Sequence, residues 1–175
     1  SGDVNYGGTL TLSGNATGGS MAVLTSATRN GSSSFASLNG SLTGATPVYK
    51  SSGLQLGLFA AGQWTGLGDG VTWVSVDNWG GGVLPGSLDD VFIATAGSTV
   101  VIGSGSHTVR SVSTVAGRAL QISGGSLTVS SASTFAGDLT VSGGSVTLNA
   151  ATSISTLNLS GSGVVNGSGS LTVQD

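Results

Sequence analysis

Cysteine and glutamate are absent from this sequence of 175 residues, and charged residues make up only 6% of it. Without cysteine, the chain can form neither disulfides nor thiolate metal sites. Without glutamate, the pair of carboxyl groups that most glycosidases use would have to come from aspartates alone. The four cationic side chains form no basic patch, so we expect no nucleic-acid binding.

Proline occurs twice, and no apolar run approaches the roughly 20 residues of a membrane-spanning helix, so we expect no membrane span. Helices are disfavoured, because the 32 glycines and the abundant serine and threonine are poor helix formers. Hydrophobic residues still make up 38% of the chain, which argues against disorder. Most of them are valine, leucine and isoleucine placed singly between serines and threonines, as in half-buried strands. We therefore expect an all-β fold.

A repeat near the C-terminus indicates which all-β fold this is. The segment Leu120-Gln-Ile-Ser-Gly-Gly-Ser-Leu-Thr-Val129 recurs as Leu139-Thr-Val-Ser-Gly-Gly-Ser-Val-Thr-Leu148 and, more loosely, from Leu157, so that the copies begin 19 and 18 residues apart. Gly-Gly also suits a hairpin turn, which is the alternative interpretation of each unit. The near-constant period, and a third short strand between copies at 133–135 and 153–156, favour a parallel β-helix with coils of about 18–20 residues.

An earlier coil is predicted over residues 99–112, with Val100 near the position equivalent to Leu120. Stacked in register, alternate residues of each strand would form apolar rows along the interior, while serine and threonine face outward. The predicted inward positions are Val101, Val109, Leu120, Ile122, Leu127, Val129, Leu139, Val141, Val146, Leu148, Ile154, Leu157 and Leu159.

Residues 1–60 have strand character without a fixed period, at 9–12, 21–24 and 54–58. They could be irregular coils of the same solenoid or a small antiparallel unit, and we favour a β unit in contact with the solenoid. The predicted organisation is an irregular N-terminal β unit over 1–60, a Trp/Asp-rich junction or solenoid cap over 61–94, and parallel β-helix coils over 95–175.

The junction is the chemically distinctive segment of the chain. It contains all three tryptophans and two polar pairs: Trp64, Trp73, Trp79, Asp77-Asn78 and Asp89-Asp90.

The order of motifs in this junction is Gly-Asp-Gly-x-x-Trp, then Asn-Trp, then Pro-Gly-x-x-Asp-Asp-Val-x-Ile. This order resembles a segment found ahead of β-helical repeats in large secreted bacterial proteins. It is similar in places to the start of G8-type domains, and the following repeats resemble those of filamentous-haemagglutinin and autotransporter passenger chains. This resemblance covers residues 64–175 and implies a secreted or cell-surface bacterial protein concerned with adhesion or polysaccharides. It does not imply an enzyme.

Three roles for the junction are open. A solenoid end exposes unpaired backbone and an apolar interior, so the segment could be a cap, with two tryptophans over the first coil and an aspartate bonding turn amides. Tryptophan faces also stack on sugars, beside polar groups that bond hydroxyls. A calcium site would use aspartate oxygens and backbone carbonyls. The carbohydrate site would consist of Trp64, Trp73, Trp79, Asp77 and Asn78, and the calcium site would include Asp69, Asp89 and Asp90.

Catalysis is not expected from this set of residues. The lone His107 follows Gly-Ser-Gly-Ser and is predicted to be a solvated turn residue, because no aspartate or nucleophile is positioned beside it. The leading hypothesis is a non-catalytic extracellular structural or adhesive module of a larger bacterial surface or secreted protein, whose partner would be a glycan or a protein surface. A carbohydrate-binding module and a fragment of a polysaccharide-degrading β-helix enzyme are the alternatives. Ice binding through the pair Thr9 and Thr11 ranks last, because that pair is not repeated in register.

Overall fold

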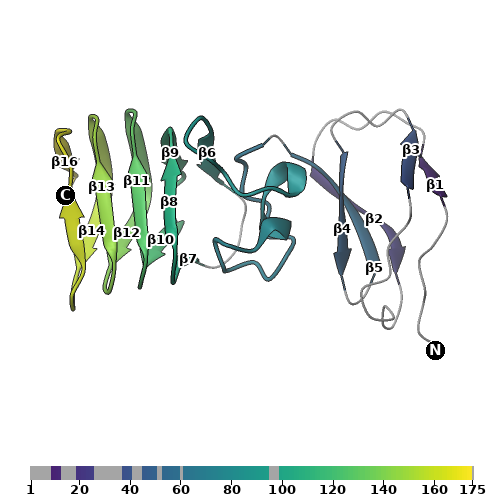
Figure 1. Cartoon of the computed structure of the whole chain (residues 1–175), viewed down its shortest axis with the longest axis horizontal. Coiled ribbons are helices and arrows are strands. Elements are labelled where there is room, and N and C mark those ends of the chain that lie inside the picture. Colours follow the sequence, from purple (N-terminus) through teal and green to yellow (C-terminus); the bar gives the residue numbers. More distant parts are fainter. Residues whose placement is uncertain are drawn as a thin grey trace.

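The computed structural model describes the backbone of residues 9–12, 19–25, 37–40, 45–50, 53–59, 61–94 and 99–174, and side chains in 59, 61–94 and 99–174. The chain is all-β, and its parallel sheets are wound into a β-solenoid of about four turns. The coils stack side by side along the long axis (Figure 1). The predicted parallel β-helix is therefore confirmed.

Each coil of the solenoid contributes a strand to each of three faces. The first face consists of β7 (Val100–Ile102), β10 (Ala119–Ile122) and the C-terminal parts of β12 (Ser133–Val141) and β14 (Thr152–Leu159). The second face consists of β8 (Ser106–Val109), β11 (Ser126–Val129), β13 (Ser145–Leu148) and β15 (Val164–Asn166). The third face consists of β6 (Asp90–Ile93), β9 (Ser111–Thr114), the N-terminal parts of β12 and β14, and β16 (Leu171–Val173). Since β6 pairs with β9, solenoid pairing begins inside the segment 61–94.

The strand register follows the sequence repeat. Leu120 lies between Val100 and Leu139, and Leu139 in turn lies next to Leu157, all in parallel pairs. The hairpin alternative is therefore wrong, because each strand pairs with its equivalent in the next coil. Residues one coil apart in space are the residues one repeat apart in the sequence.

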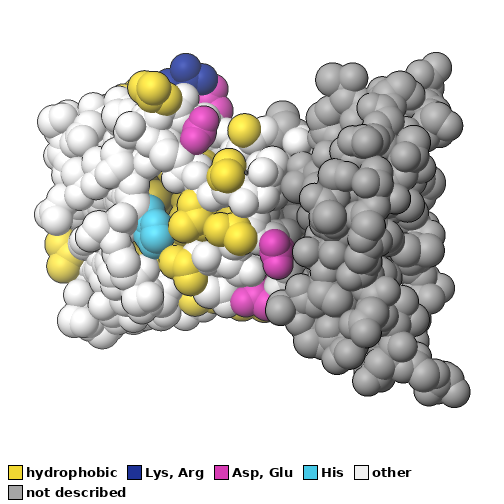
Figure 2. All heavy atoms as spheres, turned by 45° about the vertical axis from the view of Figure 1, so that its right-hand side comes forward, with side chains coloured by type: hydrophobic (Ala, Val, Ile, Leu, Met, Phe, Trp, Pro, Cys, Tyr) yellow, Lys and Arg dark blue, Asp and Glu magenta, His cyan; other side chains and the backbone are white. Residues whose placement is uncertain are grey.

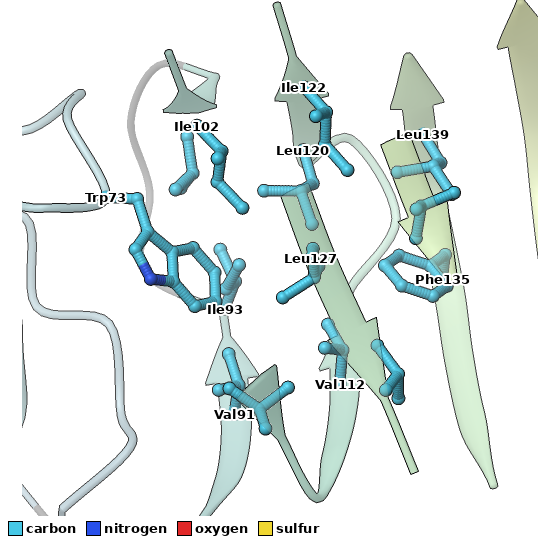
Figure 3. Close-up of a cluster of buried hydrophobic side chains, with 14 of the residues drawn as sticks. Trp73, Val91, Ile93, Ile102, Val112, Leu120, Ile122, Leu127, Phe135 and Leu139 are labelled. Carbon is cyan, nitrogen blue, oxygen red and sulfur yellow. The ribbon is translucent and has the colours of Figure 1, made fainter. Parts of the chain in front are cut away.

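One apolar core runs through the coils from the cap to β14, with alternate residues of the strands buried; Figure 3 shows part of it. Each fully buried leucine or isoleucine contributes about 1.5–3 kcal/mol through the hydrophobic effect. Two of the predicted inward positions are wrong. Val101 is half-buried, because its neighbours Val100 and Ile102 occupy the inward row. Leu159 is 54% exposed, because its strand forms the outer edge of the first face. The prediction also missed Val91, Ile93, Val112 and Phe135, which are fully or almost fully buried.

The bend between the first and second faces depends on glycine. At Gly125 the backbone has φ +69°, and a Cβ there would lie 2.3 Å from the carbonyl oxygen of Gly105 in the preceding coil. Only glycine combines this backbone conformation with such close stacking. The Ser-Gly-Gly element of the repeat is thus the sequence signature of this bend.

The N-terminal strands pair differently from those of the solenoid. They are β1 (Thr9–Leu12), β2 (Gly19–Thr25), β3 (Ser37–Gly40), β4 (Ala45–Lys50) and β5 (Gly53–Leu58). β1 and β3 form a parallel pair, and β2, β5 and β4 form an antiparallel sheet in that order. The three predicted strands correspond to β1, β2 and β5, while β3 and β4 were not predicted. β4 lies against the second of two 3₁₀ turns, η1 (Val76–Asn78) and η2 (Gly80–Gly82).

Helical structure in the described part of the chain consists of these short 3₁₀ turns. Among the described residues, no helix has the length and apolar character to cross a membrane.

Candidate functional site

The junction extends the solenoid by adding backbone to two of its faces. Residues 62–64 pair with β6, and the amide of Trp64 donates to the carbonyl of Phe92 at 2.9 Å. Residues 71–73 lie beside β7, joined by two hydrogen bonds of 2.8 and 2.9 Å to the backbone of Val101. Because these segments occupy backbone groups of the first strands on two of the three faces, the junction covers that end of the solenoid as a cap. We use "cap" below for residues 61–82.

The three tryptophans fill the interior of the cap. Their side chains are 3%, 0% and 1% exposed at Trp64, Trp73 and Trp79. Trp79 packs edge-on against both others, with ring centroids 4.9 Å and 4.6 Å away, and its Nε1 donates to the carbonyl of Trp73 at 2.7 Å. In this arrangement no indole offers an open ring face, so the predicted sugar-stacking surface does not exist at these residues as folded. Their packing is that of the cap interpretation.

Trp73 and Trp79 differ in whether the indole N–H group donates a hydrogen bond. Trp73 Nε1 is buried without a hydrogen-bond partner among the described residues, whereas Trp79 Nε1 has one. We expect Trp79→Phe to lower the free energy of unfolding by about 1–2 kcal/mol more than Trp73→Phe does, because only the former breaks a buried hydrogen bond. Urea titration followed by far-ultraviolet circular dichroism would measure the difference. Equal losses would contradict the assignment of the two N–H groups.

Asp69 and Asn78 hold the loop between the two added segments. Asp69 Oδ1 accepts hydrogen bonds from the amides of Val71 and Thr72 at 2.9 and 2.8 Å, and from Nδ2 of Asn78 at 2.7 Å. Burial alone would raise the pKa of Asp69, but the hydrogen bonds that it accepts from Thr72, Val71 and Asn78 outweigh that effect and hold the pKa well below its usual range. Asn78 is fully buried, and its Oδ1 accepts from the amide of Gly70 at 2.9 Å. Both polar groups are thus committed to the loop, and Asn78 is not open to a sugar.

The other aspartates named for ligand binding lie apart. Asp77 is exposed on η1, and Asp89 Oδ2 accepts from the amide of Gly86 at 2.8 Å, closing a turn. Among residues 61–94 and 99–174, no three acidic or histidine side chains converge on a point where a metal could bind. The structure therefore does not bring Asp69, Asp89 and Asp90 together as the calcium hypothesis required.

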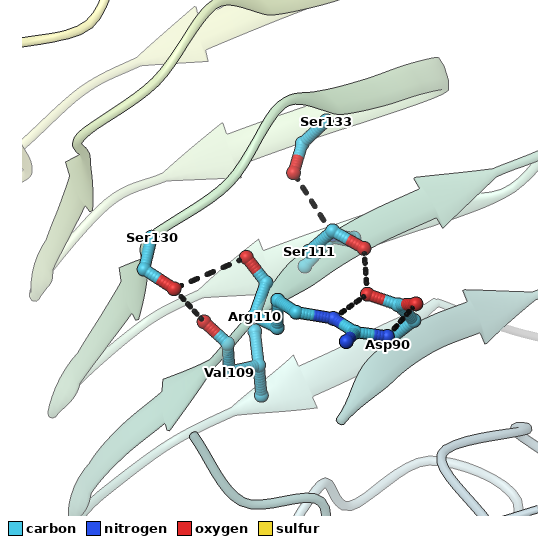
Figure 4. Close-up of polar contacts among 7 residues, drawn as sticks. Asp90, Val109, Arg110, Ser111, Ser130 and Ser133 are labelled. Carbon is cyan, nitrogen blue, oxygen red and sulfur yellow. Dashed lines mark hydrogen bonds and ion pairs between the residues drawn. The ribbon is translucent and has the colours of Figure 1, made fainter. Parts of the chain in front are cut away.

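On the third face, Asp90 forms an ion pair with Arg110 of the adjacent coil (Figure 4). Its carboxylate accepts from both Nε and Nη2 of Arg110, with the Nε contact at 2.7 Å, and from the hydroxyl of Ser111 at 2.6 Å. These hydrogen bonds, foremost that of Arg110, lower the pKa of Asp90 from 3.8 to about 2, and the pKa of Arg110 rises in turn. Both side chains are about half exposed, so solvent screens the pair.

This ion pair gives the fold a defined acid sensitivity. Because the folded-state pKa of Asp90 is depressed, its stabilising contribution is complete above the ordinary value of 3.8 and disappears as the pH falls through about 2. We expect the difference in unfolding free energy between the wild type and Asp90→Asn to be constant near neutrality. It should shrink as the pH falls from 3.8 to about 2. Chemical denaturation at a series of pH values would measure it. Arg110→Gln is the matched control, since loss of the guanidinium removes the largest cause of the lowered pKa and should move the pKa of Asp90 back toward its ordinary value.

His107 was predicted to be a solvated turn residue, and this prediction is wrong. It lies within β8, in register with the buried Leu127, and its ring centroid is 5.9 Å from that of Trp73. Its Nε2 lies 3.1 Å from the carbonyl oxygen of Ser104. His107 is half-buried and completes the inward row where the first coil meets the cap. Figure 2 shows exposed apolar side chains gathered beside this histidine.

Sequence reasoning missed a straight row of outward side chains on the third face. Each member is in register with the next, from the cap to the last strand: Gln63, Phe92, Ser113, Thr134, Ser153 and Thr172. Phe92 is 42% exposed, whereas Val91 and Ile93 on either side of it point inward. The sequence contained one signal of this row. Alternation along the strand Asp90–Ile93 places the aromatic Phe92 on the outward side. We call this set the third-face row.

A shallow groove of about 300 Å³ adjoins the last three members of the third-face row. Hydroxyl groups and alanine methyls line it: Ala132, Ser133, Thr134, Ala151, Thr152, Ser153, Ser170 and Thr172.

Comparison of the chain with models of protein families, with curated proteins and with solved structures finds no significant match.

Proposed function

We propose that this chain is a non-catalytic, extracellular structural or adhesive module of a larger bacterial surface or secreted protein. The observation that carries the proposal is the continuous solenoid itself. Its coils share one apolar core from the cap to Ile154 in β14, and their strands pair in register on all three faces. Such a body holds its outward side chains at fixed spacings, which suits a spacer or a presenting surface.

The resemblance of residues 64–175 to the repeats of secreted bacterial proteins supports the extracellular part of the proposal. The absence of cysteine is compatible with it, since stacked hydrogen-bonded coils supply stability without disulfides. The partner would be a glycan or a protein surface outside the cell.

The test combines a stability measurement with an activity assay on the whole chain. The solenoid and its cap are expected to unfold in one cooperative transition, and incubation with a panel of polysaccharides is expected to release neither reducing ends nor unsaturated products. Turnover of any polysaccharide, abolished by His107→Ala or by Asp90→Asn, would overturn the proposal in favour of a polysaccharide-degrading enzyme. Separate transitions for different coils would argue against a single structural unit.

A further inference from the structure

The third-face row and its groove form one surface with two kinds of contact. Phe92 presents an exposed aromatic ring near the cap, and hydroxyl side chains follow it in each later coil. Coils are spaced by about 4.8 Å, so the row from Phe92 to Thr172 extends about 19 Å along the solenoid axis. A ligand that used the whole surface would therefore be elongated and would lie parallel to that axis.

Several hydroxyls of this surface are available to a ligand. The side chains of Ser113 and Thr172 make no hydrogen bond within the described part of the chain, and Ser153 donates to Thr134 only at a long 3.4 Å. By contrast, Ser133 at the groove floor is committed, since it accepts from the amide of Val112 at 2.9 Å. Free hydroxyls that both donate and accept match the hydroxyls of a sugar.

The surface carries no unpaired charge. None of the eight residues that line the groove is ionisable. At the other end of the face, Arg110 is paired with Asp90, so its guanidinium does not attract an anion strongly. A uronate or sulfate group would lose hydration here without gaining a cationic partner. The chemistry therefore favours a neutral ligand.

We propose that the third face binds a neutral linear polysaccharide, which lies along the solenoid axis with one pyranose ring on Phe92 and later units in the groove. The apolar face of a pyranose stacks on an aromatic ring, as Phe92 allows. Sugar hydroxyls then exchange hydrogen bonds with Ser113, Thr134, Ser153 and Thr172. One unit of an extended polysaccharide advances its chain by a distance comparable to one coil, so successive sugars meet successive coils. This inference names a ligand class for the adhesive role proposed above and rests on that role.

The experiment measures binding of the whole chain to neutral polysaccharides of extended shape, namely β-glucan, xylan and mannan, by affinity electrophoresis and calorimetry. Polygalacturonate and alginate serve as anionic probes. We expect at least one neutral polymer to bind and Phe92→Ala to weaken that binding by about fivefold or more, as loss of an aromatic contact predicts. Phe92→Leu, which keeps apolar bulk without the ring, should also weaken it.

A pair of triple variants separates the third face from the rest of the solenoid. Thr134→Val with Ser153→Ala and Thr172→Val removes the hydroxyls of the row, and we expect it to weaken binding. Thr108→Val with Thr128→Val and Thr147→Val removes an equivalent in-register row on the second face and should leave binding unchanged. Tryptophan fluorescence, which reports on the buried cap, would verify that each variant is folded.

Three results would overturn the inference: no neutral polymer binds, only anionic polymers bind, or both triple variants lose affinity equally. Each of these results leaves the structural proposal standing if the chain still unfolds cooperatively and releases no products. Enzymatic turnover would instead contradict the structural proposal. The two failures are therefore distinguishable.

Discussion

Trp73→Ala is expected to lower the free energy of unfolding by about 3–5 kcal/mol, the usual cost of removing a fully buried large aromatic side chain. The side chain of Trp73 has no exposed surface and faces the end of the first coil beside Ile93 and Ile102 (Figure 3). Its removal leaves a cavity between cap and coil and withdraws the ring against which Trp79 packs edge-on. The loss would be measured by urea denaturation followed by circular dichroism.

Val74→Ala is the matched control for this prediction. Val74 adjoins Trp73 in the chain and is 42% exposed, so its truncation should change the free energy of unfolding by less than about 0.5 kcal/mol. If Trp73→Ala cost no more than Val74→Ala, the indole would not be part of the solenoid core. Hydrogen exchange would add a local readout, because opening of the cap should expose the amide of Val101, which donates to the carbonyl of Val71.

Gly125→Ala is expected to be more damaging than Gly117→Ala by about 2–3 kcal/mol, since overpacking costs amounts of that order. The two glycines have nearly the same backbone conformation, with φ +69° and +74°. A Cβ at Gly125 would meet the carbonyl oxygen of Gly105 at 2.3 Å, whereas a Cβ at Gly117 would meet no atom within 4 Å. Gly117→Ala thus reports the left-handed backbone alone, at about 1–2 kcal/mol.

The difference between these two variants isolates the stacking of one coil on the next. Both substitutions would be compared by thermal and chemical denaturation under the same conditions. Equal destabilisation would mean that the coils can separate locally to admit a methyl group. A larger loss for Gly125→Ala would establish that the bend is closely stacked, which is why the repeat contains Ser-Gly-Gly.

The regular coils could be predicted because their physics is local and periodic. Leu120, Leu139 and Leu157 are equivalent in sequence, and a parallel solenoid places equivalent residues side by side. The first coil was harder. Val100, Val101 and Ile102 are all apolar, so alternation alone cannot tell which of them points inward, and the choice depends on pairing with β10.

The candidate site was only partly predictable for a related reason. The wealth of tryptophan and aspartate in the junction identified the cap, but composition does not distinguish an indole packed over a coil from one offered to a ligand. That distinction depends on where the chain places Trp73 relative to Val101, which lies in another coil. The third-face row was missed because it depends on strand pairing between coils. Its members become neighbours only through five successive pairings, of which β6 with β9 is one.

The direction of the hydrogen bonds between coils has a mechanical consequence. Since each strand pairs with its equivalent in the next coil, these bonds run along the solenoid axis, parallel to the stack. A force pulling the two ends of the stack apart would load the bonds of one coil boundary at a time and peel the coils off in sequence. Each released coil of about 19 residues would lengthen the chain by about 60 Å, its extended length less one coil spacing. A module built in this way would yield in steps and absorb work at each step.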